Sequence, residues 1–138
     1  MSYLLDTSIA VALIRNRPVT VRERLRRISP DAQPIAVSSI VLFELWYGVA
    51  RSQHRPQNAE RLRSFMSGNV FVLPFEEEDA AIAGDIRAEL RSAGTLIGPY
   101  DLLIAAQALR TGATLVTANV SEFRRVRGLE WEDWTAPA

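Results

Sequence analysis

Short apolar runs recur along this 138-residue chain, and longer stretches with helical spacing separate them. The runs occupy residues 3–5, 34–37, 70–74 and 113–117. Parallel strands need crossover connections of a dozen or more residues, usually helices, which then cover the faces of the sheet. The alternation therefore predicts a three-layer α/β/α sandwich with a mainly parallel sheet.

The expected helices follow from capping residues, prolines and glycines. Two helices should follow the first strand, over 7–17 and after Pro18, and a third should begin at Ser38 or Ser39. The remaining elements are predicted as helices over 59–66, 76–94 and 98–112, and an edge strand within 128–134. The length fits one domain over residues 1–138, and no repeat or linker divides it.

The composition limits the chemistry. The chain has no cysteine and a single histidine, which excludes a thiolate zinc site, a cysteine nucleophile and a histidine-rich metal centre. Any metal would have to be held by oxygen. The chain has sixteen acidic and sixteen basic residues, and every one of the basic residues is Arg. No apolar run approaches the roughly 18 residues of a membrane span, so we expect a cytoplasmic protein without a membrane partner.

Three carboxylates stand in apolar surroundings. Asp6 directly follows the first strand, Glu44 lies in "SSIVLFELWYGVA", and Asp101 precedes "LLIAAQAL". An ionised carboxylate removed from water needs a partner, a proton or a metal. Two of these acids have a simple structural explanation: Asp6 could cap a helix, and Asp101 could be an acid in the first turn of a helix. Glu44 has no such explanation, because no basic residue that could pair with it lies within four positions.

If these three acids converge, their repulsion raises at least one pKa unless a cation neutralises them. A site made of carboxylate oxygens favours Mg²⁺ or Mn²⁺. Such an ion activates water and stabilises charge on a phosphodiester. The pattern therefore indicates metal-dependent hydrolysis.

A fourth segment, "LVTANVSEF" at 115–123, follows the strand over 113–117. Thr117, Asn119 and Glu122 should therefore emerge at the same sheet edge as Asp6. The hydroxyls of Ser8 and Thr117 are suited to orienting a carboxylate or water. Ordinary turn chemistry is the alternative explanation for Thr117 and Asn119.

Four segments in order, "LLDTS", "FELWYGV", "GPYDLLIAAQAL" and "LVTANVSEF", resemble the signature segments of PIN-domain ribonucleases. The short length and the ending "RRVRGLEWEDW" resemble most the VapC toxins of bacterial toxin–antitoxin pairs. The resemblance implies a Rossmann-like sheet and a metal-dependent endoribonuclease acting on RNA. It also implies a homodimer held inactive by a cognate small DNA-binding antitoxin.

By position, the resemblance makes Asp6, Glu44 and Asp101 the metal-binding acids. The fourth acidic position of the family falls on Asn119, which joins these acids in the expected catalytic set, and Glu122 is the nearby acid that could compensate. The number of metal ions, one or two, stays open.

Two other functions remain open from sequence. One is a PIN-like binding module that has lost turnover, with Asn119 as its sign. The other is phosphotransfer through Asp6 as nucleophile. Phosphotransfer is disfavoured because no second acid lies two residues after Asp6 and the chain has no lysine.

Several further residues have competing interpretations. Arg22, Arg26 and Arg27 could contact RNA phosphates or pair with surface acids. Trp46 and Tyr47 are interpreted as core or dimer-interface residues. The acidic run over 75–79 is interpreted as the solvated first turn of a helix, where the helix dipole favours acids.

Overall fold

The computed structural model describes residues 2–28 and 35–136, and its centre is a five-stranded sheet. The strand order is β3-β2-β1-β4-β5, and all four pairings are parallel. Leu4 on the central strand lies between Ala36 and Leu115. The strands are β1 (Tyr3–Leu5), β2 (Ile35–Ser38), β3 (Val70–Leu73), β4 (Thr114–Val116) and β5 (Trp131–Glu132).

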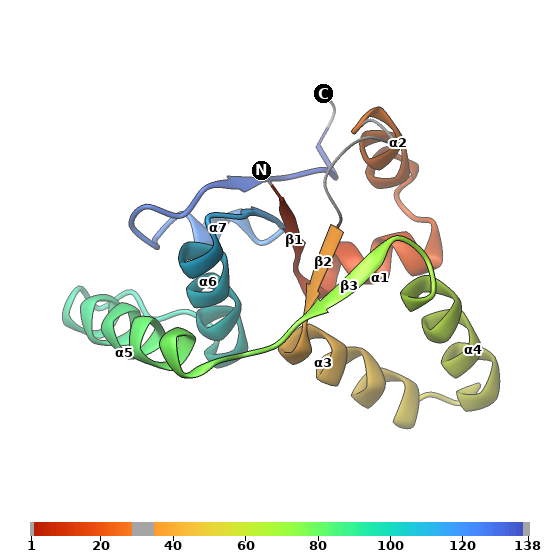
Figure 1. Ribbon diagram of the computed structural model, residues 1–138, viewed down its shortest axis with the longest axis horizontal. Coiled ribbons are helices and arrows are strands. Elements are labelled where there is room, and N and C mark those ends of the chain that lie inside the picture. Colours follow the sequence, from red (N-terminus) through yellow and green to blue (C-terminus); the bar gives the residue numbers. More distant parts are fainter. Residues whose placement is uncertain (1, 29–34, 137–138) are drawn as a thin grey trace.

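Helices connect the strands and form the outer layers. They are α1 (Thr7–Arg15), α2 (Val19–Arg27), α3 (Ser39–Ala50), α4 (Arg55–Met66), α5 (Glu77–Ser92), α6 (Pro99–Thr111) and α7 (Val120–Phe123). In Figure 1, α5 and α6 lie on one side of the sheet and α1, α2 and α4 on the other. The predicted three-layer α/β/α fold is confirmed. Among the described residues, no helix has the length and apolarity to span a membrane.

The inner strands are buried on both faces, as expected for a parallel sheet covered by helices. Every residue of β2 and β4 is buried, and Leu4 and Leu5 of β1 have no exposed surface. The edge strands β3 and β5 are more exposed. The core is therefore deepest under the strand whose end carries Asp6.

The predicted element boundaries need correction in several places. The helix expected at 59–66 begins at Arg55, because Pro56 fits the first helical turn. The strand expected at 34–37 is Ile35–Ser38, and Pro34 lies outside the described residues. The last strand covers only Trp131–Glu132, and the four-residue helix α7 was not predicted.

The acidic run before α5 is only partly a solvated face. Glu77 and Glu78 are exposed, but Asp79 is fully buried, so the interpretation is wrong for Asp79. Its carboxylate accepts hydrogen bonds from Arg110 Nε at 2.5 Å and Nη2 at 3.1 Å, and a third from the backbone N–H of Glu76. This ion pair joins α5 to α6.

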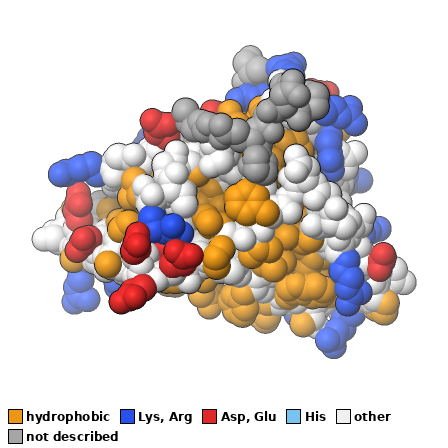
Figure 2. All heavy atoms as spheres, viewed as in Figure 1, with side chains coloured by type: hydrophobic (Ala, Val, Ile, Leu, Met, Phe, Trp, Pro, Cys, Tyr) orange, Lys and Arg blue, Asp and Glu red, His pale blue; other side chains and the backbone are white. Residues whose placement is uncertain are grey.

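Trp46 and Tyr47 are not core residues. The exposed fraction is 38% for Trp46 and 62% for Tyr47, and Arg63 and Arg51 lie over their rings. Figure 2 shows hydrophobic side chains gathered over the region of α3 and β3. The position of Trp46 and Tyr47 in a dimer interface stays a prediction.

Candidate active site

The candidate site lies at the carboxyl edge of the sheet, where open parallel sheets bind ligands. Asp6 follows β1 and Thr117 follows β4. Asn119 is the residue before α7, Asp101 lies in the first turn of α6, and Glu44 lies midway along α3.

Asp6 is almost fully buried, with 3% of its surface exposed. Oδ1 accepts hydrogen bonds from Ile9 N at 3.0 Å and Ser8 Oγ at 2.7 Å, and Oδ2 accepts one from Thr117 Oγ1 at 2.5 Å. Asp6 therefore caps α1, which is the structural role that the sequence left open for it. Burial raises the pKa of Asp6, while these hydrogen bonds oppose the rise.

Thr117 links the two loops of the site. Its hydroxyl donates to Asp6 and accepts a hydrogen bond from Asn119 N at 2.8 Å. The Ser8 hydroxyl accepts one from Ala118 N at 3.4 Å. Both hydroxyls thus hold Asp6 against the loop after β4.

Asp101, Asn119 and Glu122 form the second part of the site. Asn119 Nδ2 donates to Asp101 Oδ2 at 3.2 Å and also to Glu122 Oε2. Glu122 Oε1 accepts a hydrogen bond from Gly98 N at 3.0 Å. The Asn119 amide therefore holds two carboxylates side by side.

These contacts shift the pKa values of Asp101 and Glu122 in opposite directions. Burial raises the pKa of Asp101 to about 7, with further contributions from the hydrogen bond and charge of Glu122 and the charges of Asp6 and Glu44. The hydrogen bond from Asn119 lowers the pKa of Glu122. A proton at this pair therefore resides on Asp101.

Glu44 reaches the same site from α3. Its partner is Thr7, whose hydroxyl donates to Oε1 at 2.8 Å. The charge of Glu44 raises the pKa of both Asp6 and Asp101. Among the described residues, no Arg forms an ion pair with any of these three acids.

The predicted acids are thus brought within electrostatic reach of one another, but they do not form a closed metal cage. Within residues 2–28 and 35–136, no group of three acidic or histidine side chains is gathered closely enough to hold a metal ion. The donor set is nevertheless all oxygen, and no Arg in the described ranges forms an ion pair with these acids. Both properties fit a hard divalent cation whose remaining ligands are water.

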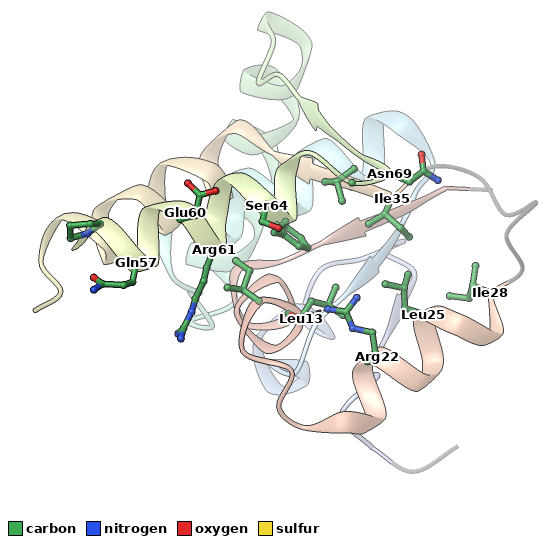
Figure 3. Close-up of a pocket in the computed structure, with 15 residues that line it drawn as sticks. Leu13, Arg22, Leu25, Ile28, Ile35, Gln57, Glu60, Arg61, Ser64 and Asn69 are labelled. Carbon is green, nitrogen blue, oxygen red and sulfur yellow. Dashed lines mark hydrogen bonds between the residues drawn. The ribbon is translucent and has the colours of Figure 1, made fainter. Parts of the chain in front are cut away.

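The predicted RNA-contacting arginines lie elsewhere. Arg22 donates from Nη2 to Leu13 O at 2.9 Å and lines a groove of about 1100 Å³ between α1, α2 and α4, which Figure 3 shows. Ile35 and Val70, the first residues of β2 and β3, also line this groove. The groove is therefore at the amino edge of the sheet, away from the acids.

Two contacts of the site were missed by sequence reasoning. The pairing of Thr7 with Glu44 spans 37 positions, and no local pattern indicates it. The second missed contact is the hydrogen bond from Gly98 N–H to Glu122. The "GP" pair at the start of α6 indicates where a helix begins, but it does not indicate that the Gly98 N–H donates to a side chain.

The model of the PIN domain family matches residues 3–129 of the chain. The chain is 38% identical over 135 residues to the tRNA(fMet)-specific endonuclease VapC of Shigella flexneri, covering 98% of this chain and 99% of that protein. It is 40% identical over 134 residues to Ribonuclease VapC2 of Rickettsia felis, covering 97% and 98%.

The chain belongs to the VapC ribonucleases of the PIN-domain family. Solved VapC structures agree with this. VapBC2 of Rickettsia felis, bound to a DNA fragment from its promoter, has a chain that matches with a TM-score of 0.90 at 40% identity, covering 97% of this chain and 99% of that one. DNA-bound VapBC of Salmonella typhimurium matches with a TM-score of 0.87 at 37% identity, covering 97% and 98%.

Proposed function

We propose that this VapC-family chain is a Mg²⁺- or Mn²⁺-dependent endoribonuclease and the toxin of a toxin–antitoxin pair. The observation that carries the proposal is the carboxyl-edge site, where Asp6, Glu44 and Asp101 interact electrostatically and, within the described part of the chain, form no ion pair with an Arg. Near full-length similarity to ribonucleases supports RNA as the substrate.

Asp6, Glu44 and Asp101 are the residues that would hold the ion. When bound, the ion activates water and stabilises the charge that develops on the phosphodiester. Thr117 and Ser8 hold Asp6 in a single orientation through hydrogen bonds of 2.5 and 2.7 Å. This leaves little freedom for Asp6 to act as a nucleophile, which argues further against phosphotransfer.

Glu122 supplies the fourth carboxylate of the site, and Asn119 orients it. This assignment is supported by the Asn119 amide, which donates to both Glu122 and Asp101. The lowered pKa of Glu122 keeps that side chain charged while Asp101 takes the proton. Glu122 therefore supplies the carboxylate that Asn119 lacks, and the Asn119 amide donates a hydrogen bond to it.

The test is cleavage of RNA by purified protein freed of any antitoxin. Cleavage should require Mg²⁺ or Mn²⁺, stop on addition of a chelator, and be lost in Asp6→Asn. Asp85→Asn, which alters an exposed acid of α5, is the matched control and should cleave normally. Activity that survives both chelator and Asp6→Asn would overturn the proposal, whereas metal binding without cleavage would favour the binding module.

The partner is a small DNA-binding antitoxin, a proposal supported by the VapBC complexes to which the chain is similar. Co-expression with a small DNA-binding protein encoded beside it should yield a stable complex with suppressed cleavage. Failure of any neighbouring product to bind or inhibit the chain would contradict the toxin assignment and leave the nuclease assignment intact.

A homodimer is proposed through the exposed apolar face of α3 and β3. The exposed apolar residues of these two elements are Phe43, Trp46 and Tyr47 of α3 and Phe71 and Val72 of β3. Light scattering after gel filtration should give twice the chain mass of 15.4 kDa. A Trp46→Glu variant should run as a monomer, and a monomeric wild type would refute the dimer.

A further inference from the structure

Gln107 is a fully buried amide on α6, and it contacts the ends of two strands. Its Oε1 accepts a hydrogen bond from Ser38 Oγ at 2.5 Å, at the end of β2. Its Nε2 donates to Leu73 O at 3.1 Å, at the end of β3. One side chain thus fixes α6 to the carboxyl edge of the sheet.

Ser38 connects this contact to α3. It is the last residue of β2 and also the N-cap of α3, where its Oγ accepts a hydrogen bond from Ile40 N at 2.9 Å. The hydrogen bond between Ser38 and Gln107 therefore joins α6, which carries Asp101, to the start of α3, which carries Glu44.

Glu44 and Asp101 are equally far along the chain from the Ser38–Gln107 hydrogen bond, which we call the joint between α3 and α6. Glu44 follows Ser38 by six residues, and Asp101 precedes Gln107 by six residues. At about 1.5 Å per helical residue, each segment is roughly 9 Å long. At the far ends Phe43 and Tyr100 pack edge to face, with ring centroids 5.7 Å apart.

A frame thus results, with the Ser38–Gln107 hydrogen bond at one end and the Phe43–Tyr100 contact at the other. Glu44 and Asp101 are the direct neighbours of the two aromatic residues. Among the described residues no ion pair joins α3 to α6. Repulsion between the two carboxylates tends to separate the helices, and the frame opposes that separation.

We propose that Gln107 is a positioning residue that sets the separation of Glu44 and Asp101 for metal binding. The inference rests on the proposed function, since it concerns the same acids. A buried amide also needs partners for stability alone, because leaving its neighbours unsatisfied is costly. The experiment must therefore separate metal binding from folding.

The test compares Gln107→Leu with Arg110→Met. Both replace a polar side chain of α6 that binds a buried partner, but Arg110 contacts α5 through Asp79 and lies outside the frame. Three quantities are measured: thermal stability without metal, Mn²⁺ affinity by titration calorimetry below both melting temperatures, and kcat and KM for RNA cleavage.

Gln107→Leu should bind Mn²⁺ roughly tenfold more weakly, the lower end of the range for direct partners of metal ligands, because Gln107 acts on the acids through the helices. Its kcat should fall while its KM for RNA stays unchanged. Arg110→Met should lose stability but bind Mn²⁺ as the wild type does. A folded Gln107→Leu with wild-type Mn²⁺ affinity would overturn the inference, and a wild type that binds no Mn²⁺ would overturn the proposed function itself.

Ser38→Ala tests the same joint if Gln107→Leu does not fold. It removes the hydroxyl that donates to Gln107 but leaves the hydrogen bond from Gln107 to Leu73. Ser39→Ala is its matched control, because the Ser39 hydroxyl instead accepts a hydrogen bond from Phe75 N. Ser38→Ala should weaken Mn²⁺ binding and Ser39→Ala should not; equal affinities in the two variants would refute the inference.

Discussion

Asp79 and Asp6 are both buried aspartates, but they are stabilised in different ways. Asp79 has no exposed surface and accepts two hydrogen bonds from the Arg110 guanidinium. Asp6 is 3% exposed, and its hydrogen-bond donors among the described residues are all neutral, namely two hydroxyls and one backbone N–H. The chain neutralises the first charge itself, whereas among the described residues no Arg forms an ion pair with the second.

Asp101 extends this contrast. Its neighbours are carboxylates and an amide, and burial together with their charges raises its pKa to about 7. Acids arranged in this way destabilise one another, which is typical of a binding site rather than of a structural contact. The Asp79 pair is therefore a structural contact, whereas the carboxyl-edge acids have the properties expected of the binding site that we propose.

The largest predicted effect concerns the structural pair. Arg110→Met should lower the free energy of unfolding by roughly 3–5 kcal/mol, because it leaves Asp79 buried without its cation. Urea denaturation measures the loss. Arg127→Met is the control, since it removes a pair with Glu89 whose Arg side chain is 87% exposed, and it should cost less than about 1 kcal/mol. Equal losses would remove the distinction.

Glu44→Gln should give the opposite result. Cleavage of RNA should fall by more than about 100-fold, since a lost ligand costs more than a lost ligand partner. Stability without metal should be unchanged or higher, because the Thr7 hydroxyl can still donate to the amide oxygen and a repelling charge is gone. Marked unfolding on thermal denaturation would show that Glu44 is structural.

Thr117→Val should have a smaller effect on the site. It removes the hydroxyl that donates to Asp6 and accepts from Asn119, so Mn²⁺ affinity should fall roughly tenfold. Thr111→Val removes a hydroxyl bound only to backbone carbonyls of α6. Calorimetry should find no change in that control, and comparable losses in both variants would exclude a specific role for Thr117.

The remaining prediction is a pH dependence of stability without metal. Asp101 titrates at about 7 in the folded chain against 3.8 as a free side chain, so the folded state holds a proton that the unfolded state releases. Stability should therefore fall as pH rises from about 4 to 7. Urea denaturation in chelator should show the fall, and Asp101→Asn should reduce it. Constant or rising stability over this range would contradict the raised pKa.

The sequence predicted that Asp6 and Thr117 lie together, because strand ends determine where both residues are placed. Asp6 and Thr117 directly follow strands that pair in parallel, so their convergence follows from the alternating pattern. The burial of Asp79 was missed because its partner Arg110 is 31 positions away on another helix. The joint between Ser38 and Gln107 spans 69 positions and depends on how α6 packs on the sheet.

Local apolarity was also a poor guide to burial in α3. The run around Glu44 contains both the buried Val41 and Leu45 and the exposed Phe43 and Tyr47. Because α3 is apolar on all sides, its own periodicity does not indicate which side faces the core. The packing of neighbouring elements decides this.

The most direct test of the central claim is anomalous diffraction from crystals of the protein grown with Mn²⁺. We predict an anomalous peak in contact with carboxylates of Asp6, Glu44 or Asp101, and none at Asp79, whose charge Arg110 already neutralises. Absence of a peak at the carboxyl-edge acids at saturating Mn²⁺ would contradict the claim that their unpaired charge forms a metal site.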